Sequence, residues 1–142
     1  MTVDGEKSFV LFPLGRKRFA LPAEKVTELA KPDRVQTFPH TTPPLAGVLV
    51  RRGRIVPVCD VAHALVGPDA PPRKFYLIAN RQFESRRECT AIPVTGECEL
   101  ASIQPRQPVG KMPAYVTEVL SLENEIVEVL DLEELVAQQE AR

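Results

Sequence analysis

One nine-residue pattern occurs twice in the chain and restricts the folds that the chain can adopt. Residues 53–61 read GRIVPVCDV and residues 124–132 read NEIVEVLDL, so a turn residue, a charge, Ile-Val, Val and Asp recur 71 positions apart. A second match, ALP at 20–22 and AIP at 91–93, has the same separation of 71 positions. Two independent matches at one separation predict two halves of related topology.

The first copy of the pattern predicts a β-hairpin. Two runs rich in β-branched residues, 48–50 and 55–58, flank the segment Arg51-Arg52-Gly53-Arg54. Gly53 tolerates the positive φ of a tight turn, and Val and Ile suit the pleated surface of the flanking strands. The hairpin therefore presents three guanidinium groups at its tip, where they can meet carboxylates of a partner.

The rest of the chain predicts a mainly β protein. Its fourteen prolines exclude long helices and favour short strands and turns. We expect further strands at 8–14, 18–22, 74–79, 88–94, 115–122 and 125–130. Helical spacing predicts a short capping helix over 23–30, a polar connection is expected at 80–87, and Asp60 and Asp131 are expected to cap a helical turn and a C-terminal helix.

This pattern of short strands, made twice, predicts two small SH3-like five-stranded β-barrels that share a hydrophobic core. We expect residues 1–142 to form one domain, with intertwined halves at about 8–66 and 74–136. The expected core residues are Phe9, Leu11, Leu21, Val26, Val48, Ile55, Val58, Leu77, Ile92, Ile126 and Val129.

Composition and motifs argue against several classes of function. A net charge of −1 argues against a general nucleic-acid binder, although Arg51–Arg54 together with Arg81, Arg86 and Arg87 would be the basic surface of such a module. That surface lacks the interleaved aromatic residues that stack on bases. The chain also has no nucleophile elbow, no phosphate-binding glycine loop and no metalloprotease motif, so we expect neither an enzyme nor a bound cofactor.

The cysteines do not predict a metal site or a disulfide framework. There are three, an odd number, and none forms a CxxC pair. Cys59 and His63 are four residues apart, but no second pair at usable spacing completes a zinc site. No signal peptide precedes the first strand and no apolar run reaches the ~20 residues of a membrane span, so we expect a cytoplasmic protein.

The same residues carry a family resemblance that covers almost the whole chain. SFVLF from Ser8, FALP from Phe19, KVTEL from Lys25 and above all RGRIVPVCDV from Arg52 resemble the CheW-like domain. That resemblance implies two intertwined five-stranded barrels. It also implies a non-enzymatic adaptor in chemotaxis signal transduction, a two-component pathway, that couples chemoreceptors to a CheA-type histidine kinase.

The resemblance also implies partners and contact residues. The kinase's CheW-like regulatory domain would dock on a barrel, and the receptor's cytoplasmic tip helix would lie between the two halves. Val26 and Glu28 match the family's positions near the receptor contact, and Arg52 and Gly53 match its Arg-Gly turn, to which Arg51 and Arg54 add charge. We expect a monomer when the protein is alone, recruited to membrane receptor arrays through its partners, and an adaptor of another sensory or motility pathway remains the alternative.

Overall fold

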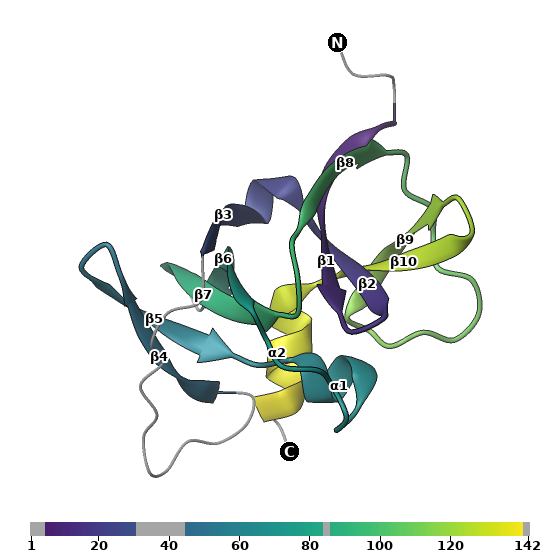
Figure 1. Ribbon diagram of the computed structural model, residues 1–142. Helices are drawn as coiled ribbons and strands as arrows, with labels where there is room; N and C mark the ends of the chain where they lie inside the picture. Colours follow the sequence, from purple (N-terminus) through teal and green to yellow (C-terminus); the bar gives the residue numbers. More distant parts are fainter. Residues whose placement is uncertain (1–4, 31–44, 84–85, 141–142) are drawn as a thin grey trace.

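The computed structural model describes residues 5–30, 45–83 and 86–140. Ten strands, one 3₁₀ turn and two helices follow one another in this order (Figure 1): β1 Lys7–Leu14, β2 Lys17–Pro22, η1 Ala23–Lys25, β3 Val26–Ala30, β4 Leu45–Arg51, β5 Arg54–Cys59, α1 Ala62–Val66, β6 Phe75–Phe83, β7 Arg86–Val94, β8 Glu99–Ile103, β9 Val116–Leu122, β10 Glu125–Leu130 and α2 Leu132–Glu140. None of the helices in these described ranges is long and apolar enough to cross a membrane.

The strands form two five-stranded sheets that exchange strands between the two halves of the sequence. One sheet, here the β1 sheet, has the order β8-β1-β2-β10-β9, and the other, the β6 sheet, has the order β3-β6-β7-β5-β4. The two orders correspond position by position: β8, β1, β2, β10 and β9 of one sheet match β3, β6, β7, β5 and β4 of the other, and matched strands are five places apart in the chain. The mainly β architecture of two small five-stranded units is therefore confirmed, and the two units have equivalent strand orders.

The separation of 71 residues seen in the sequence is also the structural repeat. β4 and β5 become β9 and β10 when their residue numbers are increased by 71. The parallel contact between β5 and β7 pairs Val58 with Ala91, and the contact between β10 and β2 pairs Val129 with Ala20, which are the same two positions 71 residues apart. The two halves thus use the same register where they cross over.

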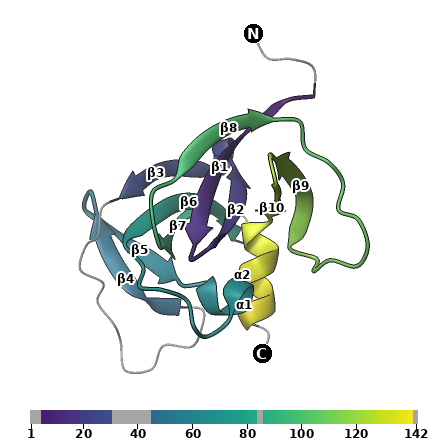
Figure 2. The same ribbon diagram turned by 45° about the vertical axis from the view of Figure 1, so that its right-hand side comes forward.

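Three apolar clusters fill the molecule. Each sheet encloses a small cluster of its own, and the two clusters share equivalent residues: Leu49 and Leu120, Val56 and Val127, Val58 and Val129, Ala91 and Ala20. A larger cluster lies between the sheets and includes Phe12 and Phe19, whose rings lie 6.1 Å apart, together with Leu77 and Ile92. The helices α1 and α2 lie side by side against this shared core (Figures 1 and 2).

The expected helix over 23–30 was wrong. Only Ala23–Lys25 is helical, as a single 3₁₀ turn, and Val26–Ala30 is a strand that pairs with β6. Val26 and Leu29 match a helical period, but Thr27 donates a hydrogen bond to the carbonyl of Ile78, 3.1 Å away, and the backbone ladder with β6 fixes the segment as extended. Tertiary pairing has overridden a weak local preference.

Two of the expected core residues are at the surface. Ile55 is 73% exposed and Ile126, its equivalent, is 58% exposed, whereas Val56 and Val127 are buried. Successive side chains of a strand point to opposite faces, so these Ile residues face outward when the Val residues face inward. Val26 and Val48 are only partly buried, and the other expected core residues are buried.

The expectation of a polar connection over 80–87 was also wrong, because β6 extends to Phe83 and β7 begins at Arg86. The two strands pair from Phe75 with Val94 out to Phe83 with Arg86. The side chains of Arg81, Arg86 and Arg87, which would have formed part of a nucleic-acid surface, lie outside the described part of the chain.

Both expected capping residues bind the backbone that follows them. The amide of Glu134 donates a hydrogen bond to Asp131 Oδ1 at 3.2 Å, which confirms an N-cap for α2. The amide of Ala62 donates to Asp60 Oδ1 at 3.1 Å, and the Arg73 guanidinium lies 2.9 Å from Asp60 Oδ2. Asp60 therefore holds a turn and the segment before β6, although the residue that caps α1 by position is Val61.

Candidate functional site

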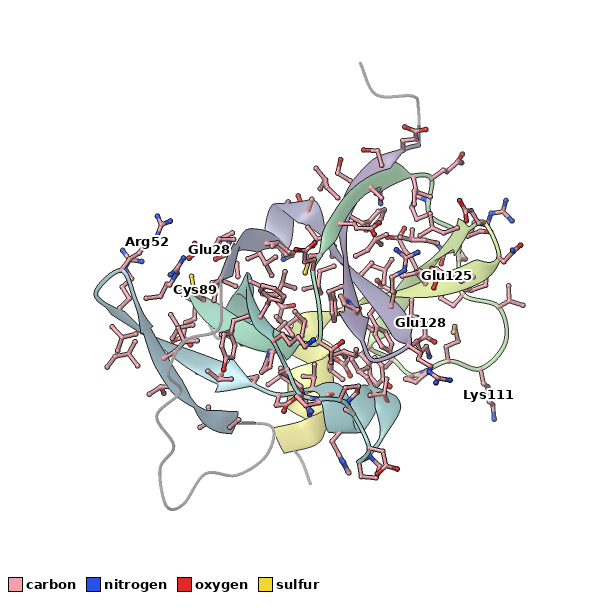
Figure 3. All side chains as sticks on the ribbon, in the orientation of Figure 1. Glu28, Arg52, Cys89, Lys111, Glu125 and Glu128 are labelled. Carbon is pink, nitrogen blue, oxygen red and sulfur yellow. The ribbon has the colours of Figure 1, made fainter. Side chains whose placement is uncertain are left out.

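The predicted hairpin is formed by β4 and β5 and ends in a two-residue turn. Arg51 pairs with Arg54, which leaves Arg52 and Gly53 as the turn residues, with φ of 54° and 76°. Positive φ at both central residues is the geometry of a type I′ turn, which matches the twist of antiparallel strands. A positive φ is uncommon for a residue other than glycine, and Arg52 adopts it because the tight turn requires it. Its side chain therefore lies at the end of the hairpin (Figure 3).

Glu28 lies on β3, next to this hairpin in space although far from it in the sheet order. β3 and β4 are the two edge strands of the β6 sheet. Arg51 Nε and Nη2 donate to Glu28 Oε1 and Oε2, each at 3.1 Å. The pair is a bidentate carboxylate–guanidinium contact, and it joins the two edges of one curled sheet.

A bulge in β3 sets the direction of Glu28. The register with β6 shifts between Val26, which pairs with Ala79, and Glu28, which pairs with Ile78. A bulge interrupts the regular alternation of side chains. Val26 packs against the shared core, while Glu28 faces the hairpin.

The other two arginines of the tip are more exposed. Arg52 is 78% exposed at its side chain and its Nη2 reaches Glu28 Oε2 only at 3.4 Å. Arg54 is exposed and, among the described residues, forms no ion pair. Val50 and Ile55 pair across the hairpin directly behind the tip, and both are exposed, so the cations border an apolar surface.

The contacts of the cluster lower the pKa of the Glu28 carboxyl. The hydrogen bond from Arg51 lowers the pKa of the Glu28 carboxyl below its usual value of 4.5, helped by the nearby charges of Arg51 and Arg52 and opposed by partial burial. Glu28 is therefore ionised at neutral pH, and it offsets one of the positive charges of the hairpin.

The structure brings five of the six predicted contact residues together. Glu28 and the tip residues Arg51, Arg52, Gly53 and Arg54 form one cluster. Val26 is two residues away on the same strand, but its side chain is turned toward the core.

One feature of the cluster was not anticipated from the sequence. Arg51 pairs with Glu28, and its contacts with that carboxylate are shorter than the contact that Arg52 makes. Residues 28 and 51 are distant in sequence, so no local spacing signals their pairing.

A small hollow lies between the two halves of the molecule. Leu21, Pro22 and Lys25 of the first half and Asp131 and Glu133 of the second half help to line it. Burial, together with nearby Glu133 and Glu134, raises the pKa of Asp131 even though the Glu134 amide binds its carboxylate. The hollow combines an apolar floor with charges of both signs.

The described residues contain no group of three or more metal-ligating side chains. His63 lies in α1, while Cys59 is buried at the end of β5. Asp60 is bound by the guanidinium of Arg73 and by the backbone of α1.

Comparison with known proteins places this geometry in a family. The model of the CheW-like domain matches residues 8–86, which is more than half of the chain. A structural match is the scaffolding protein TtCheW from Thermoanaerobacter tengcongensis, with a TM-score of 0.76 and 20% sequence identity over 91% of this chain and 86% of that chain. A search of curated proteins gave no match. The family match and the shared double-barrel fold show that the chain belongs to the CheW-like domain family.

Proposed function

We propose that this protein is a non-enzymatic adaptor that couples chemoreceptors to a CheA-type histidine kinase in chemotaxis signal transduction. It would act in the cytoplasm and join membrane receptor arrays through its partners. The observation that carries the proposal is the Arg-Gly hairpin, which is the most specific part of the family resemblance and is anchored to Glu28 by Arg51.

The hairpin has the properties of a protein-docking surface. Arg52 and Arg54 extend beyond the Glu28–Arg51 pair, next to the exposed side chains of Val50 and Ile55. Arginine beside an apolar patch is typical of the residues that dominate binding at protein interfaces. The kinase's regulatory domain would dock here, with its carboxylates on the arginines and its apolar side chains on Val50 and Ile55.

The receptor would use the other feature, the hollow between the two halves. A tip helix lying along it would meet the partly exposed ring of Pro22, which lies above the buried Leu21 and Leu132, with Lys25 and Glu133 available to polar groups at the borders of the hollow. An amphipathic helix in an apolar groove is a common mode of peptide recognition. The hairpin packs on the apolar cluster of the β6 sheet and the hollow lies on the shared core, within one packed molecule. The adaptor would therefore hold receptor and kinase in a fixed relative geometry, and a small receptor motion would reach the kinase.

Affinity capture from lysate of the source cell tests this function. Purified tagged protein is incubated with nuclease-treated lysate at moderate salt, and the bound proteins are identified by mass spectrometry. We expect a histidine kinase and a chemoreceptor. A kinase and receptor of another sensory pathway would instead support the alternative adaptor role, and recovery of neither class would contradict the proposal.

Two charge reversals show whether the hairpin is the contact. Arg52→Glu should reduce kinase recovery, and because Arg52 is 78% exposed the thermal midpoint should stay nearly unchanged. Arg16→Glu, at an exposed position in the turn between β1 and β2, is the matched control and should leave recovery at the parent level. Equal losses with both variants would mean that general charge, and not the hairpin, governs capture.

A further inference from the structure

A second hollow lies where the β1–β2 turn, the segment between α1 and β6 and the end of β7 meet. This basic hollow has a volume of about 790 Å³ and is lined by residues 14–17, Val66, residues 69–72, Lys74 and Thr95. None of these residues lines the hollow proposed for the receptor or belongs to the β4–β5 hairpin, which projects to the left in Figure 1. Pockets that hold small molecules typically enclose roughly 300–1,000 Å³.

Hydrogen bonds fix the three segments of the basic hollow to one another. The Thr95 hydroxyl accepts a hydrogen bond from the Gly15 amide at 2.9 Å and donates one to the carbonyl of Pro13 at 3.2 Å. The amide of Lys74 donates to the carbonyl of Val94 at 2.7 Å. The β1–β2 turn and the segment before β6 are therefore both tied to the end of β7.

Arg73 holds the remaining wall of the basic hollow. Its guanidinium lies 2.9 Å from Asp60 Oδ2 and donates to the carbonyls of Ala70 and Pro71 at 3.3 and 2.9 Å. The ring of Pro71 in turn lies against the turn, because a Cβ placed on Gly15 would come within 3.2 Å of it. The hollow is therefore formed before a ligand enters, and a preformed site loses less free energy on ordering.

Positive charge is in excess in the basic hollow. Its lining residues include the cations of Arg16, Lys17 and Lys74 but a single carboxylate, that of Asp69. Among the described residues, neither Arg16 nor Lys74 forms an ion pair, whereas Lys17 lies 3.4 Å from Glu128. The whole chain has a net charge of −1, so this excess of two positive charges is a local feature.

Apolar side chains line the rest of the basic hollow. Leu14 is buried, Val66 packs against the shared core, and Pro71 and Pro72 are exposed. A ligand could therefore bury an apolar part here while the cations bind its charged part, which is the usual composition of a small-molecule site.

Charge and shape favour a phosphate ester as the ligand. A phosphate monoester carries about −1.5 to −2 charges at pH 7, which matches the local excess. Arginine offers phosphate oxygens a planar fork of donors, and lysine offers them a compact ammonium. A peptide is recognised along an extended groove or a sheet edge, whereas the basic hollow is confined between three segments.

We propose that the basic hollow binds a nucleotide, that is, a phosphate monoester with a flat apolar base. The phosphate lies between Arg16 and Lys74, and the base lies against Val66 and Pro71. Arg16 follows β1 and Lys74 precedes β6, and these strands belong to different sheets. The bound nucleotide therefore bridges the two sheets and stabilises the folded protein. This proposal does not rest on the proposed function.

Titration of the isotope-labelled pure protein with AMP, followed by amide chemical shifts, tests the proposal without any kinase or receptor. We expect saturable shifts centred on Gly15, Lys74 and Thr95, and a thermal midpoint that rises with AMP concentration. Adenosine lacks the phosphate and inorganic phosphate lacks the base, so each should bind at least about tenfold more weakly than AMP. Inorganic phosphate that binds as tightly as AMP, or shifts that spare these three amides, would overturn the proposal. A glutamate-rich peptide that binds here more tightly than AMP would also overturn it, in favour of an acidic protein segment.

Charge reversals locate the site. Arg16→Glu and Lys74→Glu change exposed side chains, so each should weaken AMP binding at least about tenfold and leave the thermal midpoint of the ligand-free protein nearly unchanged. Lys111→Glu, at an exposed position between β8 and β9 (Figure 3), changes the net charge equally and should bind AMP like the parent. An equal loss with Lys111→Glu would show that general charge governs binding and would overturn the proposal. Because the hairpin is separate from the basic hollow, Arg16→Glu should still capture the kinase at the parent level.

Discussion

Glu28 and Arg51 join the two edge strands of one five-stranded sheet through two hydrogen bonds of 3.1 Å. The equivalent positions of the other sheet are Glu99 and Leu122, and there Glu99 instead meets Arg18 at 3.3 Å. Edge strands that carry unpaired backbone groups invite unwanted pairing, and charged side chains at an edge oppose it. The pair therefore stabilises the curled shape of the β6 sheet and also fixes the base of the proposed docking hairpin.

The first prediction concerns the coupling between these two residues. The side chains of Glu28 and Arg51 are 22% and 36% exposed, so the pair should contribute about 0.2–1 kcal/mol to the free energy of unfolding, as measured for exposed ion pairs. A double-mutant cycle with Glu28→Gln and Arg51→Met, followed by urea denaturation, measures this coupling. The same cycle with Arg54→Met in place of Arg51→Met should give no coupling.

The second prediction concerns the dependence of stability on pH. The pKa of Glu28 is lower in the folded protein than its usual 4.5, so the folded state favours the ionised carboxylate. Its contribution is therefore present above the unfolded-state pKa and is lost as the pH falls below about 4.5. Unfolding measured between pH 7 and pH 3 should show that Glu28→Gln loses less stability on acidification than the parent. An equal loss in both proteins would contradict the assigned ion pair.

The duplicated fold could be predicted because each copy of the repeat consists of short sequence patterns. The Gly53 and Asn124 hairpins, the caps of the following helices and the alternating apolar residues are all short-range signals. The segment 23–30 was not predictable in this way, since its apolar residues fit a helix and a strand, and only the pairing of β3 with β6 decides between them. The contact between Glu28 and Arg51 could not be predicted either, because it forms only when the sheet curls and brings its two edge strands together.

The third prediction compares two isoleucines. Ile92 is 1% exposed within the shared core and Ile55 is 73% exposed on the hairpin. Ile92→Ala should lower the free energy of unfolding by about 2–5 kcal/mol because it removes buried methyl groups and leaves a cavity. Ile55→Ala should change it by no more than about 0.5 kcal/mol. Denaturant unfolding of the two variants, side by side, checks both values, and a large loss from Ile55→Ala would place that side chain in a buried contact.

The fourth prediction concerns Asp131 at the start of α2. Asp131→Ala removes the acceptor for the Glu134 amide and should cost about 0.5–2 kcal/mol. Asp131→Asn keeps a hydrogen-bond acceptor and removes the ionisable carboxyl group. The pKa of that carboxyl is raised by burial and by the nearby carboxyl groups of Glu133 and Glu134. A raised carboxyl pKa in the folded state means that the ionised form opposes folding at neutral pH, with this penalty absent below the unfolded-state pKa. At pH 7 the midpoint of thermal unfolding of Asp131→Asn should therefore equal or exceed that of the parent, and the midpoint of Asp131→Ala should lie below it.

The fifth prediction concerns the reactivity of Cys98. Burial raises the pKa of its thiol from 9.0 to about 11, so at pH 8 the thiolate fraction is about a hundredfold smaller than that of an unperturbed thiol. The thiolate is the reactive form, and iodoacetamide should therefore modify Cys98 about a hundredfold more slowly than a free thiol of ordinary pKa. Peptide mass spectrometry after timed alkylation of the folded protein follows this residue separately from Cys59 and Cys89. In denaturant the rate at Cys98 should rise to that of the free thiol, because unfolding returns the sulfur to water, whereas equal rates in the folded and unfolded protein would mean that Cys98 is not shielded by the fold.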